Sequence, residues 1–316
     1  MVVIVIVNYN GFTDTLKCVE TLLQSTYKEF YILVIDNNST DGSINKMQNG
    51  LESLKVDFDV TDNVFMGQMC HKVVIIKSLF NGGFAYANNI GIKYTQNNID
   101  SYKYIWFLNN DTLVQDNTLQ ALVEYMKCAE GHIGLLGAKL MFMDNPQIIQ
   151  GIGGKYNKFW ARCSHIGAYE EDRGQYNNCT ILMDYIIGAS MFVRKEFVDS
   201  VGLMCEDYFL YFEELDWINR GKCGEWKFAF CHDAIVLHKE GGSTKVNNNM
   251  ISEIADVCQI KNRLLFTYKY YPFYLFSVLP ACLLTILSRL IKGEPRRASI
   301  LMKNVISTLR KILNEK

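Results

Sequence analysis

Apolar and polar positions fall in blocks along the first part of the chain, and each block has its own periodicity. Residues 2–7 are continuously apolar and β-branched, which predicts a strand buried on both faces of a parallel sheet. Residues 13–24 carry apolar residues at helical spacing, with Thr13 or Asp14 as the N-cap. Further strands are predicted at residues 31–35, 73–76 and 104–108, and a helix at about residues 85–96. The alternation predicts an α/β fold with a mostly parallel central sheet flanked by helices.

Polar clusters follow these predicted strands directly. The clusters are residues 8–10, 36–38, 81–83 and 109–111. The carboxyl ends of parallel strands share one edge of a sheet, and ligands of such folds bind outside that edge. We therefore expect one crevice that holds a nucleotide.

The pattern changes in the second half of the chain. Residues 151–178 are rich in Gly, Tyr and charge without periodicity, which predicts a long loop or hairpin. Residues 234–237 predict a short strand that ends at His238. We expect one domain over residues 1–250, with a nucleotide-binding half at about 1–115 and a second half at 116–250 to which the family resemblance described below assigns the acceptor and the catalysis. A C-terminal helical extension is expected over residues 251–316.

Residues 273–288 of this extension are uncharged and apolar around Pro280, a run shorter than the roughly 20 residues of a bilayer-spanning helix. Basic residues follow Arg289, opposed only by Glu294 and Glu315. These features predict peripheral attachment to the anionic inner face of a cell membrane. The alternative is that these helices pack against the core or form a homodimer. The basic residues are Lys292, Arg296, Arg297, Lys303, Arg310, Lys311 and Lys316.

Composition narrows the classes of function. A net charge of -1 gives no global field toward nucleic acid, so no nucleic-acid partner is expected. The 10 cysteines form no CxxC pair, which argues against a zinc ribbon or a redox dithiol. Residues 2–7 are too short for a secretory signal core, so a reducing cytoplasm is the expected location.

Three groups of residues carry candidate chemistry. Asp111, beside Asn109 and Asn110, offers oxygen ligands suited to Mn²⁺ or Mg²⁺, although an Asn-Asp turn explains the same residues. Glu213 and Glu214 lie in an apolar setting that raises a carboxylate pKa and suits a general base, unless they only begin a helix. His238 follows a strand and suits a metal site or a structural role.

The ordered set of motifs resembles family 2 glycosyltransferases with a GT-A fold, in particular a bacterial branch that includes rhamnosyltransferases. The match runs from residue 2 to about residue 245. It rests on the segments at residues 5–11, 34–43, 81–85, 106–111, 188–191 and 208–216.

The resemblance implies an inverting, metal-dependent transfer from a nucleotide-sugar, dTDP-rhamnose or a UDP-hexose, to a glycan or polyprenyl-linked acceptor in bacterial surface polysaccharide synthesis. It implies Glu214 as catalytic base with Glu213 beside it, and Asp111 and His238 as ligands of Mn²⁺ or Mg²⁺. Asn109 departs from the aspartate that is usual at its position. The implied nucleotide-sugar contacts are Asn8, Asn10, Asp36, Asn38, Gly83, Asn110 and Asp111, and the implied acceptor contacts are Gly188, Ala189 and Asp216.

Two alternatives have their own signatures. A non-catalytic nucleotide-sugar-binding subunit would lack the acids at 111 and 214, and both are present. A sugar nucleotidyltransferase would begin with a Gly-rich loop followed by Arg and Lys, whereas Phe12, Thr13 and Asp14 follow Gly11. The triplet Lys261, Asn262 and Arg263 could meet a lipid-linked pyrophosphate or lie on a solvated helix face.

Overall fold

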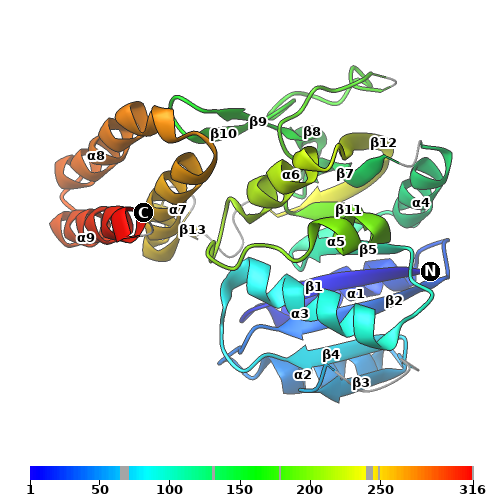
Figure 1. Cartoon of the computed structure of the whole chain (residues 1–316). Coiled ribbons are helices and arrows are strands. Elements are labelled where there is room, and N and C mark those ends of the chain that lie inside the picture. The colour runs from blue at the N-terminus through cyan, green and yellow to red at the C-terminus, as the bar shows by residue number, and fades with distance from the viewer. Residues whose placement is uncertain (65–70, 130–131, 178, 240–244, 248–249, 315–316) are drawn as a thin grey trace.

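The computed structural model describes residues 1–64, 71–129, 132–177, 179–239, 245–247 and 250–314. Its first half alternates strands and helices as the periodicity predicts (Figure 1). In chain order the elements are β1 (Val2–Asn8), α1 (Phe12–Leu23), β2 (Phe30–Asp36), α2 (Ser43–Ser53), β3 (Phe58–Thr61), β4 (Val73–Lys77), α3 (Gly83–Asn98), β5 (Tyr104–Asn109), β6 (Thr112–Val114) and α4 (Thr118–Cys128). The predicted N-cap of the first helix was wrong: Gly11 occupies that position and makes no side-chain cap.

The second half adds mainly antiparallel strands. They are followed by a region of helices. The elements are β7 (Ile133–Phe142), β8 (Asn145–Gly151), β9 (Gly154–Asn157), β10 (Arg162–His165), β11 (Ser190–Arg194), α5 (Lys195–Val201), α6 (Glu213–Cys223), β12 (Lys227–His238), β13 (Lys245–Asn247), β14 (Met250–Ile251), α7 (Glu253–Tyr270), the 3₁₀ helix η1 (Pro272–Tyr274), α8 (Leu275–Ile291) and α9 (Pro295–Asn314).

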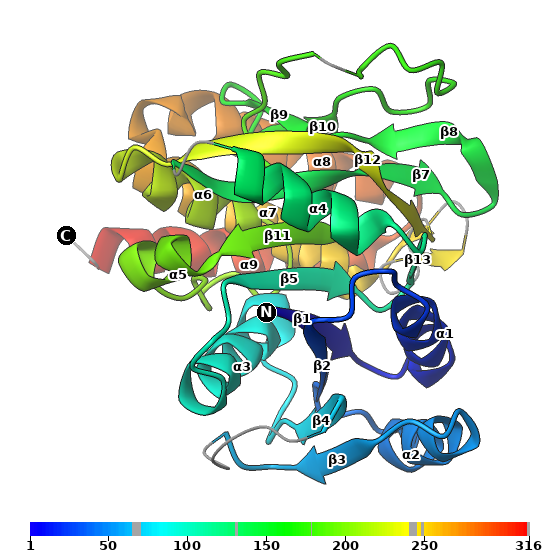
Figure 2. The same ribbon diagram turned by 90° about the vertical axis from the view of Figure 1, so that its right-hand side faces the viewer.

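One central sheet contains most of the strands, in the order β3-β4-β2-β1-β5-β11-β7-β12-β6, with β8 paired to β7. Figure 2 shows this order from bottom to top. The β1, β2, β4 and β5 pairings are parallel, whereas β11 is antiparallel to both of its neighbours. The chain therefore forms a mixed α/β fold around a largely parallel sheet, as predicted.

The continuous apolar run of β1 is buried on both faces, which explains why it shows no alternation. Val3 and Val5 pack with the core under α3, while Val2, Ile4 and Ile6 pack with the core under α1, α2 and α4. All five side chains are fully buried. Both faces of the sheet are thus covered by helices, and its carboxyl-terminal edge is left for a ligand.

Two predicted segments differ in extent from the structure. The short strand expected at residues 234–237 is the end of the 12-residue strand β12, which starts at Lys227 and is interrupted by a register shift between Cys231 and Ile235. Polar His232 and Asp233 at this irregularity hid the strand from a periodicity argument. The region expected as a loop or hairpin contains the antiparallel hairpin β9–β10.

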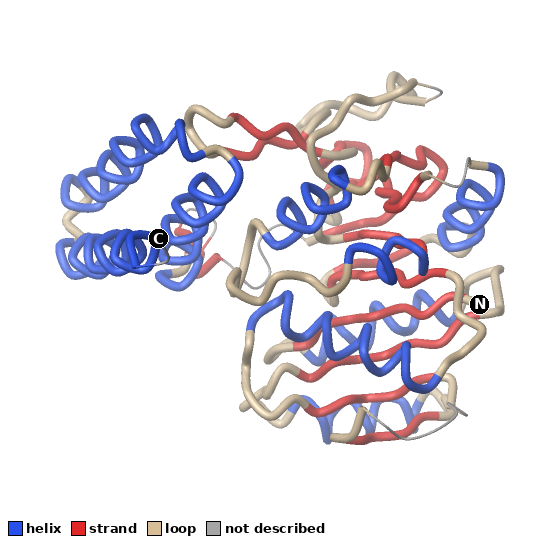
Figure 3. Tube along the Cα trace, viewed as in Figure 1, coloured by secondary structure: helices blue, strands red, loops and turns tan. Residues whose placement is uncertain are grey.

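The C-terminal region is helical apart from the short pair β13–β14 and lies to one side of the sheet (Figure 3). Residues Pro272–Ile291 form a 20-residue helical stretch with a mean hydropathy of 1.9, so by length and composition it can cross a membrane. Because η1 and α8 are consecutive, the stretch is longer than the apolar run read from the sequence. Only 28% of it is buried in the protein.

Candidate active site

The predicted polar clusters lie together at one edge of the sheet. In the parallel register Asn8 stands opposite Asp36, and Val7 stands opposite Asn109. The strand ends of β1, β2 and β5 therefore present their polar residues side by side, as expected from the sequence.

Asn8 and Asp36 form a buried pair at the centre of this edge. The Asn8 amide donates to Asp36 Oδ1 at 2.8 Å and to Ser39 Oγ at 3.1 Å, and Thr15 donates to Asn8 Oδ1 at 2.8 Å. The Ser39 backbone N–H donates to Asp36 Oδ2 at 3.0 Å. Asn8 thus holds the Asp36 carboxylate in place. Thr15 and Ser39 were not predicted, since a hydroxyl residue in a loop or helix gives no distinctive signal.

Asn10 and Asn38 lie above this pair in two exposed loops. Both adopt positive φ angles, 53° and 62°, which asparagine tolerates better than most residues. Asn10 Oδ1 accepts from the Thr40 backbone N–H at 2.8 Å, and the Asn10 N–H donates to Ser39 Oγ at 2.9 Å. The two loops therefore support each other and leave exposed amides at the mouth of the crevice.

Gly83 joins this edge to the segment that precedes α6. Its φ angle is +87°, and a Cβ there would lie 2.1 Å from the Phe209 carbonyl oxygen, so only glycine fits. The next residue, Phe84, donates its N–H to the same oxygen at 2.9 Å. Gly83 therefore sets the distance between α3 and the segment carrying the acids.

Asp111 lies between β5 and β6, next to His238 at the end of β12, because β6 pairs with β12. His238 Nε2 lies 3.2 Å from Asp111 Oδ1, and His238 Nδ1 lies 2.6 Å from Gln150 Oε1. Because an amide oxygen only accepts, Nδ1 is the donor in the contact with Gln150, and Nε2 is the ring nitrogen that lies next to Asp111. Gln150 belongs to β8 and was not predicted, since 88 residues separate it from His238.

This pair fits a hard divalent ion. Two neighbouring ligands of an octahedral ion with bonds of about 2.1 Å lie about 3.0 Å apart, close to the observed separation. No group of three or more His, Cys, Asp or Glu side chains that could hold a metal occurs among the described residues. A two-ligand site leaves the remaining positions to phosphate oxygens and water, which is the usual arrangement for Mg²⁺ with nucleotides.

The other residues of the motif have separate contacts. Asn109 Nδ2 lies 3.4 Å from His238 Nε2, and Asn110 Nδ2 donates to Thr15 Oγ1 at 3.1 Å. The Asn109 N–H donates to the Ala189 carbonyl at 3.0 Å. Ala189 is buried, whereas a Cβ on Gly188 would meet no atom within 4 Å. Of these two residues, which with Asp216 make up the three predicted acceptor contacts, only Gly188 borders open space.

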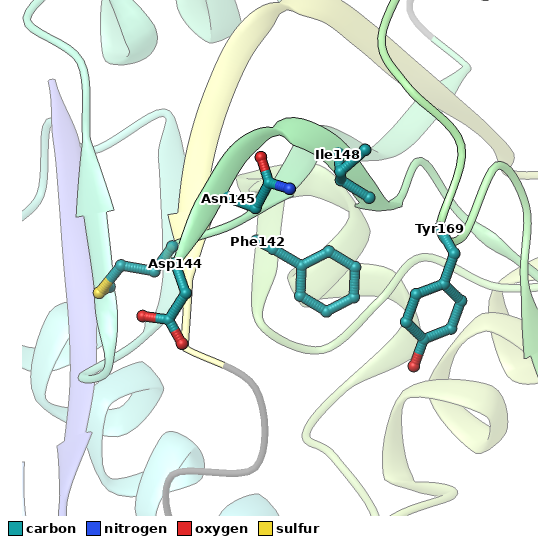
Figure 4. Close-up of a pocket in the computed structure, with 6 residues that line it drawn as sticks. Phe142, Asp144, Asn145, Ile148 and Tyr169 are labelled. Atoms are coloured by element: carbon teal, nitrogen blue, oxygen red, sulfur yellow. The ribbon is translucent and has the colours of Figure 1, made fainter.

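One hollow lies beside Asp111, and a second hollow adjoins the first. One, of about 220 Å³, includes Asp14, Asp111, Asp144 and Lys239, and the Lys239 ammonium lies 3.1 Å from Asp14. The other, of about 440 Å³, is lined by Phe142, Asp144, Asn145, Ile148 and Tyr169 (Figure 4). They share Met143 and Asp144, so an open groove continues outward from the Asp111 carboxylate.

Glu213 and Glu214, here called the acid pair, are the first two residues of α6. The sequence had offered such a helix start as the alternative to a catalytic role. Tyr211 and Phe212 just before them have positive φ angles of 69° and 76°, which is unfavourable for aromatic residues. Asn262 of α7 stabilises this turn, because its amide donates to the Leu210 and Tyr211 carbonyls at 2.8 and 2.9 Å.

The two carboxyl groups differ in access. Glu213 is only 4% exposed and its Oε2 has no hydrogen-bond partner, whereas Glu214 is partly exposed. Burial raises the pKa of Glu214 to about 7, and burial together with the charge of Glu214 raises the pKa of Glu213 well above its ordinary value. Glu213 is therefore the less accessible of the two acids, and Glu214 is the one that an acceptor can reach.

The predicted acceptor contact of Asp216 was wrong for this structure. Its side chain is fully buried and binds Arg220 Nε at 2.9 Å, Lys269 Nζ at 2.6 Å and the Tyr270 hydroxyl at 2.8 Å. Residues two apart on a helix point about 200° apart, so Asp216 faces away from Glu214. It holds α7 against α6.

Among known proteins, residues 3–196 of the chain match the family described as Glycosyl transferase family 2. The chain belongs to this family.

A curated family relative with matching sequence is Glycosyltransferase GlyG of Streptococcus pneumoniae serotype 4, at 24% identity over 127 residues. The match covers 40% of this chain and 35% of the relative, so the chain spans about a third of that protein's length.

Solved structures share the GT-A fold of glycosyltransferases. GalNAc-T7 with UDP, GalNAc and Mn²⁺ has a TM-score of 0.63 at 14% identity, over 87% of this chain and 48% of its own. The mannosyltransferase PcManGT of Pyrobaculum calidifontis, in complex with GDP-Man and Mn²⁺, has a TM-score of 0.55 at 11% identity, over 100% and 87%. S. aureus TarS 1-349 has a TM-score of 0.50 at 12% identity, over 98% and 89%.

Proposed function

We propose that the protein transfers a sugar from a nucleotide-sugar to an acceptor hydroxyl, with inversion at the anomeric carbon. The observation that carries the proposal is the Asp111–His238 pair at 3.2 Å, on the sheet edge that also presents Asn8 and Asp36. Membership of Glycosyl transferase family 2 supports it. The Mn²⁺ named with GalNAc-T7 and PcManGT supports a divalent ion in such a fold.

On the donor side, Asp36 and the loop amides of Asn10 and Asn38 hold the nucleoside. Asp111 and His238 hold Mn²⁺ or Mg²⁺. The ion would supply positive charge against the charge that grows on the departing diphosphate. The Gln150 contact would orient the His238 ring for such an ion.

On the acceptor side, Glu214 is the general base. The acceptor oxygen attacks the anomeric carbon as the bond from that carbon to the diphosphate oxygen breaks. The leaving nucleoside diphosphate takes the electron pair of that bond, and the Glu214 carboxylate takes the hydroxyl proton. A pKa of about 7 leaves much of this carboxylate ionised at neutral pH while keeping it basic.

The surroundings favour an acceptor at a membrane surface. The outer side of the 20-residue stretch Pro272–Ile291 is apolar, and exposed Lys292, Arg296, Lys303 and Arg310 follow it. We propose attachment to the cytoplasmic face of the cell membrane and a lipid-linked or glycan acceptor of a bacterial surface polysaccharide. The proposed donors are dTDP-rhamnose or a UDP-hexose.

A panel of nucleotide-sugars, assayed with Mn²⁺, with Mg²⁺ and with EDTA for release of the nucleoside diphosphate, tests this function. We expect release with one donor, dependent on the ion. Asp111→Asn and His238→Ala should abolish it, while His232→Ala on the same strand should not. Absence of both turnover and thermal stabilisation with every donor would contradict the proposal.

A further inference from the structure

The structure separates the roles of three consecutive residues on α7. Lys261 donates to the Asp207 carbonyl at 3.1 Å, and Asn262 holds the turn before the acid pair. Arg263 is different, because its Nη1 is buried and makes no hydrogen bond to any described residue. A buried, unpaired guanidinium nitrogen is costly, so this position needs an explanation.

Arg263 lies where three elements meet. Its charge is close to Tyr156, Arg162 and Cys163 of the hairpin β9–β10 and to Cys282 of α8, and burial followed by the charge of Arg162 lowers the pKa of Arg263. Within the described ranges no carboxylate forms an ion pair with Arg162 or Arg263. Two cations that converge without a counter-ion repel each other, and an anion between them would reverse the sign of that interaction.

The site formed by Arg162, Cys163 and Arg263, here called the arginine niche, lies beside the turn that precedes the acid pair. Tyr156 stands opposite Cys163 in the hairpin, and its ring lies 6.2 Å from the Phe212 ring. Burial, and to a lesser extent the charge of Glu214, raise the pKa of the Cys163 thiol to about 12, while Arg263 opposes the rise. Asn157 stands opposite Arg162 in the same hairpin, and the Tyr156 ring also packs against Phe266 of α7 at 5.2 Å. The hairpin therefore brings Arg162 and Cys163 beside α7 and the acid pair.

On its other side the niche borders an apolar surface. The hairpin is tied to α8, since Ser277 donates to the Phe159 carbonyl at 2.7 Å and the Phe159 and Phe276 rings lie 5.9 Å apart. Phe159, Trp160, Phe273 and Phe276 are 42%, 44%, 78% and 57% exposed. Figure 1 shows the hairpin extending from the sheet to α8, so this surface lies beside the niche.

We propose that the arginine niche binds the phosphate or diphosphate of a lipid-linked acceptor. The order of features is an acid pair, two arginines and an apolar surface. That order matches a molecule with a sugar hydroxyl, an anionic bridge and a hydrocarbon chain. Arg263 and Arg162 clamp the anion, the chain lies along the exposed aromatic residues and α8, and the sugar hydroxyl reaches Glu214. The inference rests on the proposed function and specifies its acceptor.

Binding to the full chain, measured with EDTA present to exclude ion-mediated phosphate binding at Asp111, tests the niche. The probes are farnesyl diphosphate, farnesol and inorganic pyrophosphate, followed through the fluorescence of exposed Trp160 or by calorimetry. We expect farnesyl diphosphate to bind more tightly than either of its parts. Arg263→Gln should weaken that binding about ten- to a hundredfold, as expected for loss of charge-assisted hydrogen bonds. Arg162→Gln should weaken it less, and Arg263→Lys should restore part of it.

Arg173→Gln, an exposed arginine in the loop after β10, is the matched control and should bind farnesyl diphosphate like wild type. Thermal unfolding separates binding from folding, because removal of an unpaired buried charge should not lower the melting temperature. Unchanged farnesyl diphosphate binding by Arg263→Gln would overturn the proposal.

A second arm distinguishes the acceptor phosphate from ordinary lipid headgroups. Vesicles of phosphatidylcholine with phosphatidylglycerol should bind Arg263→Gln as well as wild type. If that variant lost vesicle binding while Arg173→Gln kept it, the niche would be a phospholipid site and the acceptor assignment would be wrong. Donor-dependent nucleotide release by wild type is measured in parallel. If the release fails, the proposed function fails, whereas loss of farnesyl diphosphate selectivity alone contradicts only this inference.

Discussion

Glu214 and Glu213 are adjacent in sequence but differ in what their carboxylates can reach, and this difference leads to a pH prediction. A general base must be ionised to accept a proton. With a pKa of about 7 for Glu214, nucleotide release should be low in acid and rise with pH to a plateau above about pH 8. Glu214→Gln should lower the turnover number about 10²- to 10⁴-fold while donor binding is retained.

Glu213→Gln is the matched control for this prediction. Because a neutral glutamine at position 213 leaves the more exposed Glu214 in place to accept the proton, the rate should still rise with pH. Steady-state rates over the pH range measure both variants. A large loss of rate in Glu213→Gln with full activity in Glu214→Gln would reverse the assignment.

Gln150 gives a second prediction at this scale. Its Oε1 fixes the tautomer of His238 through the 2.6 Å contact with Nδ1, and such outer contacts typically change metal affinity 10- to 100-fold. Gln150→Ala should therefore raise the Mn²⁺ concentration for half-maximal nucleotide release by about that factor, with little change in rate at saturating Mn²⁺. Gln147→Ala on the same strand serves as the control. Equal Mn²⁺ dependence in all three proteins would remove Gln150 from the metal site.

At the scale of elements, the α6–α7 junction depends on a buried carboxylate. Asp216 is fully buried and binds Arg220, Lys269 and Tyr270. Asp216→Asn removes the negative charge between two cations, and we expect it to lower the free energy of unfolding by about 3 kcal/mol. Urea unfolding measures the loss. Asp207→Asn breaks the exposed pair with Lys311 and should cost less than about 1 kcal/mol. Similar losses in the two variants would contradict this account.

The residues of the site differ in how far the sequence alone could predict their positions. Strand ends place Asn8, Asp36 and Asp111 at one edge by the rules of parallel sheets, so these positions followed from local pattern alone. Asp216 was misassigned because a motif shows which residues are neighbours in sequence but not which face of the helix each one occupies. Gln150 was missed because only the β7–β8 pairing brings it to His238. The hairpin β9–β10 was left open because its alternation is short and its strands are polar.

For the whole molecule, the arrangement of the domains predicts how the protein meets a membrane. Exposed Leu283, Leu284, Leu287, Leu290 and Ile291 form one side of α8, and α9 adds Met302, Ile306 and Leu313 among basic residues. A peripheral helix pair of this kind binds through apolar insertion and through attraction to anionic lipid, about 1 kcal/mol for each Lys or Arg near the surface. Binding should therefore depend on both salt and anionic lipid.

Vesicle co-sedimentation of the full chain measures this dependence. Wild type should bind vesicles that contain phosphatidylglycerol and dissociate in high salt, because screening weakens attraction between exposed charges. Leu284→Glu with Ile291→Glu replaces side chains that are 60% and 79% exposed and should weaken binding about a hundredfold, since burying each apolar side chain contributes about 1.5 kcal/mol or more. Leu54→Glu, a 39% exposed leucine at the end of α2, should have no effect. Retention that resists both high salt and alkaline carbonate would instead mean that Pro272–Ile291 spans the bilayer, because a spanning helix is held by hydrocarbon rather than by surface charge.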